Sequence, residues 1–256
     1  MLLAIDVGNT NIVIGCMDGE DVLFTERLST DVGKTSLEYA ILIRTALDIH
    51  GIQVSMIDGA IIASVVPPVT PIVRSALKKI TGIRALVIGP GIRTGLNIHQ
   101  EDPSSVGADL IAGAVGALHK YKPPVIVIDM GTATTLSVID QNGVFRGGAI
   151  MPGLVLSLHS LVSETSMLQG ISLDQPKRVI GNNTEEAMRS GLVYGHAAMV
   201  DGMLDRMEEE LGKDVTVVAA GNMAAGIVPV CRHSIELDST LMFTGMQVIY
   251  QKNRRS

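Results

Sequence analysis

The chain has 256 residues, of which 46% are hydrophobic and 18% are charged, and this content is enough for one large core or two small ones. Its longest apolar runs have the length of strands, far below the roughly 20 residues of a membrane helix, and no signal-peptide pattern opens the sequence, so we expect a cytoplasmic protein without a membrane partner. A net charge of −6 argues against nucleic acid as the main partner, and two cysteines without CxxC spacing argue against a disulfide framework or a structural zinc.

The first half of the sequence predicts strands that alternate with helices. Short apolar runs between turn residues indicate buried strands, and apolar residues at helical spacing indicate helices. The predicted strands are 2–5, 12–16, 22–28, 60–66 and 85–88, and the predicted helices are 37–49 and 69–80. This alternation is typical of an α/β fold with crossover connections.

The second half begins with an echo of the first. Residues 124–135 read PVIVIDMGTATT and resemble LLAIDVGNTNIV at the start, with Asp129 lying 123 positions (129 minus 6) after Asp6. The strand-turn-strand pattern that follows is also the same. Two copies of one βββαβα unit predict a duplicated pair of domains.

The boundary between the two copies is expected at Lys122-Pro123-Pro124, where proline ends the preceding helix. This position gives predicted domains at 1–121 and 122–256. The last part of the chain predicts a long helix over 185–211 that is interrupted or kinked near 191–195, a strand at 215–219 and a final helix at 240–251.

Each copy has a polar turn after its first strand. The turns read Asp6-Val7-Gly8-Asn9-Thr10 and Asp129-Met130-Gly131-Thr132-Ala133-Thr134. Glycine allows close approach of the backbone to a ligand, N–H groups and Asn or Thr side chains can hold phosphate oxygens, and aspartate can bind Mg²⁺. A hairpin turn with an Asx cap explains either one alone. Because the pattern occurs twice, we expect the two turns to face each other across a cleft and to bind one polyphosphate.

The pair of turns resembles the phosphate-1 and phosphate-2 loops of the actin/Hsp70/sugar-kinase superfamily. The spelling DVGNTN and DMGTATT is similar to that of the type III pantothenate kinases. The resemblance continues over nearly the whole chain, in Pro67-Pro68, 89–91, 94–97, 106–109, 147–153 and 180–184. It implies duplicated actin-like ATPase (ribonuclease H-like) domains, each with a mixed sheet flanked by helices.

The resemblance also implies an activity and its residues. The family phosphorylates pantothenate with ATP, the first step of coenzyme A biosynthesis, and uses Mg²⁺ and a monovalent cation, K⁺ or NH4⁺. Asp109 matches the catalytic base. Matching positions assign ATP binding to Asp6, Gly8, Asn9, Thr10, Gly131, Thr132 and Thr134, metal binding to Asp6 and Asp129, and acceptor binding to Gln100, Gly107, Ala108, Asp109, Leu110 and Thr184. Because Thr184 matches a residue that a second subunit lends to the pantothenate pocket, a homodimer is implied.

From the residues alone, Asp109 has two interpretations. It precedes the apolar run 110–118 and therefore fits a helix N-cap. Alternatively, a carboxylate within hydrogen-bond reach of a hydroxyl can accept its proton during phosphoryl transfer. The resemblance favours the second interpretation.

The chain departs from the family pattern at several positions, including Asp102-Pro103 where Asn-Pro is usual and Ala220 where a threonine is usual. Leu110 stands where an arginine is expected, Gln100 where a tyrosine is usual, and Asn222 where a glycine is usual. An arginine could bind a carboxylate or phosphate through two hydrogen bonds, and losing such a charge-assisted pair costs about 1.5–3 kcal/mol. The alternatives are therefore a paralogue that phosphorylates another small alcohol and a nucleotide-binding regulator without catalysis.

Overall fold

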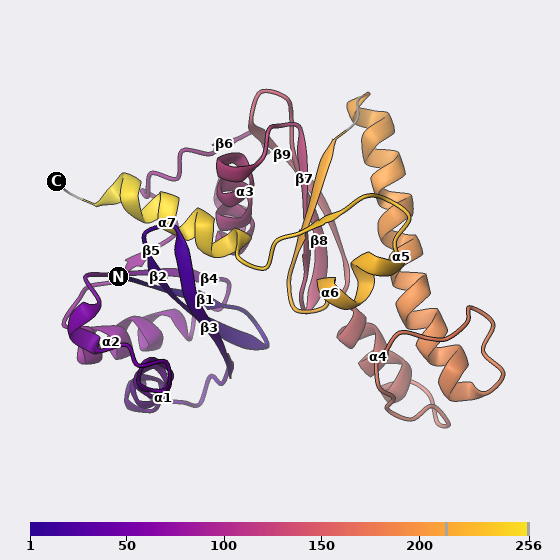
Figure 1. Ribbon diagram of the computed structural model, residues 1–256, viewed down its shortest axis with the longest axis horizontal. Coiled ribbons are helices and arrows are strands. Elements are labelled where there is room, and N and C mark those ends of the chain that lie inside the picture. Colours follow the sequence, from indigo (N-terminus) through magenta and orange to yellow (C-terminus); the bar gives the residue numbers. More distant parts are fainter. Residues whose placement is uncertain (213–214, 255–256) are drawn as a thin grey trace. The chain divides into compact units, whose positions relative to one another are not determined.

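The structure is a computed structural model that describes residues 1–212 and 215–254. The chain forms two compact units, each with its own sheet and its own hydrophobic core (Figure 1). The first unit consists of Met1–Leu96, Glu101–Lys120 and the segment that begins at Thr240. The second consists of Asn97–Gln100 and Tyr121–Ser239.

The first unit contains the strands β1 (Leu2–Val7), β2 (Asn11–Asp18), β3 (Asp21–Ser29), β4 (Gly59–Ser64) and β5 (Leu86–Val87). They form one sheet in the order β3-β2-β1-β4-β5. The first three strands are antiparallel neighbours, and β4 and β5 continue the sheet in parallel with β1. The near-continuous apolar residues of β1 and β4 fit strands that are buried on both faces. The sequence pattern predicts buried strands at both places.

Helices cover both faces of this sheet, with α1 (Ser36–Ile49) and α2 (Thr70–Thr81) on one face and α3 (Ala108–Lys120) and α7 (Leu241–Asn253) on the other (Figure 1). α1 begins at a capping box in which Thr35 and Glu38 exchange hydrogen bonds. α2 ends at Gly82, whose φ of 72° is the left-handed conformation that favours glycine.

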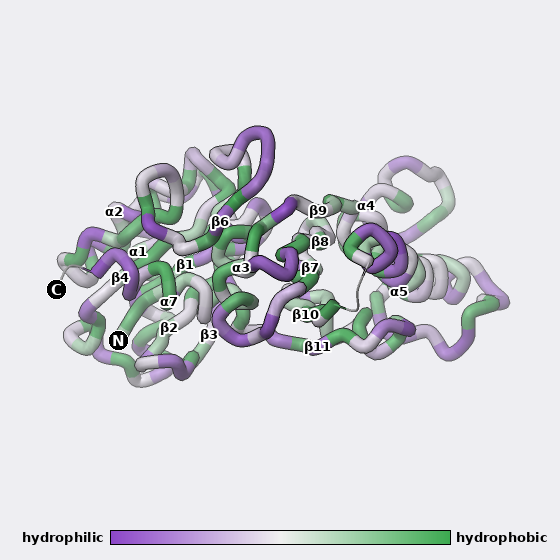
Figure 2. Tube along the Cα trace, turned by 90° about the horizontal axis from the view of Figure 1, so that it is seen from above, coloured by the Kyte–Doolittle hydropathy of each residue, from purple (hydrophilic) through white to green (hydrophobic). Residues whose placement is uncertain are grey.

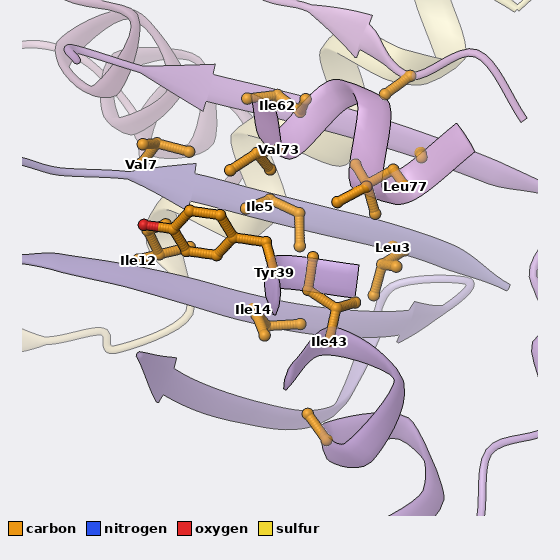
Figure 3. Close-up of a cluster of buried hydrophobic side chains, with 14 of the residues drawn as sticks. Leu3, Ile5, Val7, Ile12, Ile14, Tyr39, Ile43, Ile62, Val73 and Leu77 are labelled. Atoms are coloured by element: carbon orange, nitrogen blue, oxygen red, sulfur yellow. The ribbon is translucent and has the colours of Figure 1, made fainter. Parts of the chain in front are cut away.

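Alternate side chains of β1 point into the core beneath α1 and α2. Leu3, Ile5 and Val7 lie there with Tyr39 and Ile43 of α1, and all five side chains are almost completely buried (Figure 3). Burying one side chain of this size contributes about 1.5–3 kcal/mol to stability. This cluster therefore fixes the position of β1 and of the turn that follows it.

On the opposite face, α3 and α7 pack closely through two glycines. A Cβ atom added at Gly245 would lie 1.8 Å from the carbonyl oxygen of Ala112, and one added at Gly116 would lie 2.1 Å from that of Leu241. No side chain fits at these separations. The two helices therefore approach each other to a distance that only glycine allows.

The second unit contains the strands β6 (Asn97–Ile98), β7 (Val125–Met130), β8 (Ala133–Ile139), β9 (Val144–Pro152), β10 (Thr216–Ala220) and β11 (Glu236–Leu237). Their order is β11-β10-β7-β8-β9-β6. Strands β9, β8 and β7 are antiparallel neighbours, and β10 and β11 run parallel to β7, as β4 and β5 run parallel to β1 in the first unit. The predicted duplication is confirmed, with β6 as an added strand beside β9.

The helices of the second unit are α4 (Leu154–Ser163), α5 (Thr184–Leu211) and the short α6 (Ala224–Ile227). They pack on the face of the sheet to which Ile126, Ile128 and Met130 point. In Figure 2 the tube is hydrophobic along most of β1 and β7, in agreement with their burial. Three single-turn 3₁₀ helices occur at Val54–Met56, Pro103–Ser105 and Val228–Val230.

The structure differs from the sequence prediction at the predicted helix interruption and in the units to which 97–100 and 241–253 belong. The predicted interruption near 191–195 is absent, because α5 is one helix of 28 residues. An interior glycine costs only about 1 kcal/mol, and buried neighbours such as Leu192 and Val193 hold the helix on the core. In addition, α7 belongs by its contacts to the first unit, although it follows the second in the sequence.

Candidate functional site

The first polar turn connects β1 to β2, and hydrogen bonds hold both the N–H and the carbonyl oxygen of its Gly8. The N–H of Gly8 donates to the carbonyl oxygen of Asn11 at 3.0 Å, and the Thr30 hydroxyl donates to the carbonyl oxygen of Gly8 at 2.6 Å. Asn9 and Thr10 are exposed at the tip of the turn. The predicted phosphate-binding residues of this turn therefore lie at the surface of the first unit.

Asp6 is half-buried one residue before the end of β1 and lies on the face that α3 and α7 cover. Its neighbours Ile5 and Val7 point into the core under α1, and successive side chains of a strand point to opposite faces. Asp6 pairs with Ala63 of β4, so the carboxyl ends of these two parallel strands coincide. This edge of the sheet is the place where the turn begins.

Asp109 is the second residue of α3 and reaches the same edge of the sheet. A Cβ atom added at Gly107 would lie 2.3 Å from Asp109 Oδ1 and 3.5 Å from Cγ1 of Val65. Val65 directly follows β4, and its N–H donates to the carbonyl oxygen of Val7 at 3.1 Å. The carboxylate of Asp109 therefore lies over Gly107, beside the carboxyl ends of β1 and β4.

The surroundings of Asp109 change its acidity. Burial raises the pKa of this carboxyl above its usual value, and hydrogen bonds from the backbone N–H groups of Leu110 and of Asp109 itself oppose part of that rise. The Leu110 N–H donates to Oδ1 at 2.8 Å. Asp109 lies inside the first turn of α3 rather than at the N-cap, although it does accept this bond from the helix N-terminus. A half-buried carboxylate with a raised pKa is a better proton acceptor than an exposed one.

The residues beside Asp109 are all uncharged. Ala108 is buried, while Gly107 and Leu110 are half-buried. Asp109 is therefore the one charged side chain of the predicted acceptor positions 107–110. A negatively charged acceptor receives no opposite charge from this segment.

The second polar turn repeats the first within the second unit. The N–H of Gly131 donates to the carbonyl oxygen of Ala133 at 3.0 Å, and Thr132 is exposed at the tip. Asp129 stands near the end of β7, as Asp6 does in β1. Gly221 follows β10 with a φ of 93°, and a Cβ atom there would lie 2.6 Å from Asp129 Oδ1. Glycine is required there both by its conformation and by the close carboxylate.

Thr134 differs from the other residues predicted to bind phosphate. Its side chain is 1% exposed, and its Oγ1 lies 2.9 Å from Nε2 of His196 in α5. Burial lowers the pKa of His196, so the ring is neutral at physiological pH. The hydroxyl thus fastens β8 to α5, and its position does not support the predicted phosphate contact. Gly131 and Thr132 remain the candidates of this turn.

Two predicted acceptor residues belong to the second unit. Gln100 follows β6, and its Nε2 would lie 2.8 Å from a Cβ atom at Gly147 in β9. Thr184 is the exposed first residue of α5, directly after the N-cap Asn183, whose side chain accepts a bond from the N–H of Glu186. Thr184 also lines a cavity of about 770 Å³ at the start of α5.

The part of the chain that the structure describes contains no group of three His, Cys, Asp or Glu side chains able to hold a metal ion by themselves. Mg²⁺ is usually held by one or two carboxylates together with substrate phosphates, so a single aspartate beside each polar turn fits this ion. None of the described helices combines the length and the apolar content needed to cross a membrane.

Sequence reasoning did not identify two supporting residues. His196 supports β8 behind the second turn, and its spacing of four residues from both Leu192 and Val200 on the buried face of α5 was the available signal. Gly221 directly precedes Asn222 in the sequence, and no predicted site includes it. Its contact with Asp129 depends on the pairing of β7 with β10, which no local pattern reveals.

Comparison with solved structures identifies the fold. The chain is similar to a ROK hexokinase from Thermus thermophilus, with a TM-score of 0.53, 13% identity and 99% of each chain covered. It is also similar to a ROK family glucokinase from Streptomyces griseus, with a TM-score of 0.54, 13% identity and 98% of each chain covered. The architecture is therefore the duplicated actin-like kinase fold.

Comparison of sequences identifies the family. Residues 2–206 match the family model of type III pantothenate kinase. A type III pantothenate kinase of Exiguobacterium sp. is 42% identical over 255 residues, with all of both chains covered. Another from Halalkalibacterium halodurans is 42% identical over 253 residues, which covers 99% of this chain and 100% of the relative. The chain thus belongs to the type III pantothenate kinase family.

Proposed function

We propose that the chain transfers the γ-phosphoryl group of ATP to the primary hydroxyl of pantothenate and releases 4′-phosphopantothenate and ADP. The observation that carries this proposal is the half-buried carboxylate of Asp109, which lies over Gly107 at the strand ends where the Asp6 turn begins. Membership of the family supports the identity of both substrates.

Each polar turn would bind phosphate oxygens of ATP. In the first turn the candidates are Asp6, Gly8, Asn9 and Thr10, and in the second they are Gly131 and Thr132. Backbone N–H groups and small polar side chains at such turns favour anions. Asp6 and Asp129 would hold Mg²⁺ and a monovalent cation, K⁺ or NH4⁺, whose charge offsets that of the phosphates.

Asp109 would act as the general base. Its carboxylate accepts the proton of the acceptor hydroxyl while that oxygen bonds to the γ-phosphorus, and the bond from this phosphorus to the β–γ bridging oxygen breaks to leave ADP. The Leu110 N–H holds Oδ1 at 2.8 Å and so orients the carboxylate. Burial, which raises the pKa of Asp109, keeps it a stronger base than an exposed aspartate.

Leu110 supports a second candidate acceptor. The uncharged segment around Asp109 supplies no partner for the carboxylate of pantothenate, and a missing charge-assisted pair weakens binding by roughly ten- to a hundredfold. A small alcohol without a carboxylate would not suffer this loss. The alternative function is therefore ATP-dependent phosphorylation of such an alcohol by the same base.

A homodimer would complete the acceptor pocket. Around the cavity that Thr184 lines, the second unit exposes large apolar side chains, including Ile180 at 84% and Met167 at 87% exposure. Exposed apolar side chains gathered in one region are typical of interfaces. A second copy of the chain is the occupant that the family implies, and light scattering should give twice the mass of one chain.

Product analysis tests the proposed activity. Purified protein is incubated with Mg-ATP, K⁺ and pantothenate, and 4′-phosphopantothenate is followed by mass spectrometry. We expect time-dependent product from the native chain and from Asp48→Asn, an exposed control on α1, and about 10²–10⁴-fold less from Asp109→Asn. Undiminished turnover in Asp109→Asn would exclude the base. ATP binding without product would favour an uncharged alcohol as the acceptor or a nucleotide-binding regulator without catalysis, and product from such an alcohol would distinguish the two.

A further inference from the structure

The first unit contains a cavity of about 520 Å³ beside the edge strand β5. Its wall is formed by β5, the residues directly before it, the loop that follows it and the end of α7, together with Arg74 of α2. None of the residues that line it belongs to the turn at 6–10 or to the start of α3. Ligand cavities usually measure about 300–1,000 Å³, so this one has room for a small molecule.

Three arginines line this cavity, namely Arg74, Arg84 and Arg254, and none of its described lining residues is an aspartate or glutamate. Arg254 lies 3.7 Å from the carboxylate of Asp58, which is outside the cavity wall. Within residues 1–212 and 215–254, neither Arg74 nor Arg84 forms an ion pair or side-chain hydrogen bond. A chain with a net charge of −6 thus gathers unpaired positive charge at one place.

The rest of the wall is apolar. Leu86, Ile92 and the ring of Tyr250 contribute to it. The Tyr250 hydroxyl would lie 2.2 Å from a Cβ atom at Gly59, so this ring is seated on the backbone of β4 where only glycine leaves room. The cavity therefore pairs guanidinium groups with a surface suited to a hydrocarbon or aromatic group.

The position of the wall is fixed by hydrogen bonds between distant parts of the chain. The N–H of Arg93 donates to Oδ1 of Asn253 at 3.1 Å, and Nδ2 of Asn253 donates to the carbonyl oxygen of Arg93 at 2.9 Å. This pair joins the loop after β5 to the last turn of α7. The arginine and apolar parts of the cavity are thus held in place before any ligand arrives, which lowers the entropy lost on binding.

We propose that this cavity binds a small phosphate ester with an apolar or aromatic substituent. Arginine binds phosphate through two parallel hydrogen bonds, and the apolar part of the wall can bury the substituent. A carboxylate ligand would satisfy one guanidinium, whereas a phosphate dianion can satisfy two or three. The site is separate from the proposed kinase chemistry and does not depend on it.

Two probes separate the charged and apolar contributions. Inorganic phosphate and phenyl phosphate are titrated into the full chain by calorimetry, without Mg²⁺ and with EDTA so that metal-dependent nucleotide binding does not interfere. We expect phenyl phosphate to bind at least about tenfold more tightly than inorganic phosphate, because the ring buries apolar surface. Equal affinity for the two probes, or no binding of phenyl phosphate, would overturn the proposal.

Charge-matched variants locate the site. The double variant Arg74→Gln/Arg84→Gln should weaken phenyl phosphate binding at least about tenfold, since each guanidinium supplies charge-assisted bonds. Arg27→Gln/Arg44→Gln removes the same charge from exposed positions of β3 and α1 and should change affinity less than about twofold. Equal weakening by both pairs would mean that net charge, not this cavity, attracts the probe.

A second variant keeps the test decisive if the first unfolds. Arg84 is exposed, so Arg84→Glu should leave the thermal midpoint close to that of the native chain while it abolishes phenyl phosphate binding. Retained binding in a folded Arg84→Glu chain would also overturn the proposal. Because product formation from pantothenate is measured separately, failure of this site and failure of the proposed kinase activity are distinguishable.

Discussion

At the scale of single residues, the position of the Asp109 carboxylate depends on the absence of a side chain at Gly107. A side chain at this position would occupy the place of the Asp109 carboxylate, since its Cβ atom would lie 2.3 Å from Oδ1. The obstructed atom is the end of a side chain and not backbone, so the carboxylate can rotate away without unfolding the helix. Gly107 is therefore expected to govern activity more than stability.

We expect Gly107→Ala to lower kcat by about 10²-fold, because a displaced base no longer reaches the acceptor hydroxyl. Its thermal midpoint should stay within a few degrees of the native value. Gly89→Ala is the control, since a Cβ atom there meets nothing within 4 Å. Steady-state kinetics of both variants give the answer, and an unchanged kcat in Gly107→Ala would show that the carboxylate works in another position.

The acidity of Asp109 leads to a prediction about stability. Burial raises its pKa in the folded chain above the unfolded value, so the folded state holds this proton more tightly than the unfolded state. The ionised carboxylate therefore destabilises the fold above the raised pKa. This penalty disappears as the pH falls through the folded pKa toward the unfolded one.

Asp109→Asn removes the buried charge but keeps an oxygen that can accept the Leu110 N–H. We expect the variant to unfold at a higher temperature than the native chain at pH 7, by on the order of a few degrees. The difference should shrink toward pH 4. Thermal unfolding of both chains between these pH values tests this, with Asp48→Asn as the exposed control. A lower midpoint for Asp109→Asn at pH 7 would contradict the sign.

The residues of the site were predictable to different degrees. Asp6 and Asp129 stand out because each ends an apolar strand, and the structure places both near strand ends. For Thr134, the predicted phosphate contact competes with the alternation of side chains along β8. Thr134 shares the parity of Leu136, which is 1% exposed, and so it had to point into the core.

At the scale of elements, the crossing of α3 and α7 restricts the choice of residue most strongly, because two of its positions accept only glycine. Both Gly116 and Gly245 sit where a Cβ atom would meet the backbone of the other helix. Backbone cannot move aside as a side chain can, so a methyl group there has to separate the helices.

We expect Gly245→Ala to destabilise the chain by about 1–3 kcal/mol or more through overpacking. Gly195→Ala, in α5, is the matched substitution, because its Cβ atom would meet nothing within 4 Å. It should stabilise by up to about 1 kcal/mol, the difference in helix propensity. Urea unfolding measures both. Equal effects of the two substitutions would show that helix propensity, and not the helix crossing, sets the outcome.

Most long elements follow from local sequence, and those that depend on partners do not. The predicted strands at 2–5 and 12–16 and the helix at 37–49 correspond to β1, β2 and α1 within a few residues. The two-residue strands β6 and β11 exist because β9 and β10 offer free edges, and nothing in their own residues marks them. Helix α4 directly follows a long strand and has no capping side chain at its start, so the local start signal was missing.

At the scale of the whole molecule, the chain returns to its first unit after completing the second. The position of α7 could not be predicted from its own sequence, because the residues that it packs against lie far away in the chain. Phe243 covers Gly15 of β2, where an added Cβ atom would lie 2.5 Å from its ring, and Tyr250 covers Gly59 of β4. The glycines of β2 and β4 thus leave room for aromatic side chains that follow some 200 residues later (243 minus 15 is 228).

This arrangement predicts that the first unit cannot fold without the end of the chain. Truncation after Ser239 removes α7 and exposes one face of the sheet that contains β1 and β4. Exposing apolar surface costs about 25 cal/mol per Å². Because the net stability of a domain is small, the loss of a whole packed helix exceeds it. We expect hydrogen-exchange mass spectrometry to show lost protection in β1, β2 and β4, while β7 and β8 stay protected by their own core.

Truncation after Asn253 provides the matched control, because it keeps all of α7 and should leave exchange in β1 unchanged. The comparison isolates the helix from any general effect of a shortened chain. Protection of β1 and β4 that survives the loss of α7 would mean that α1 and α2 alone hold the sheet, and that the contacts of α7 serve only its own position. Loss of protection in both units at once would mean that the second core also depends on this helix, although its buried residues come entirely from 126–227.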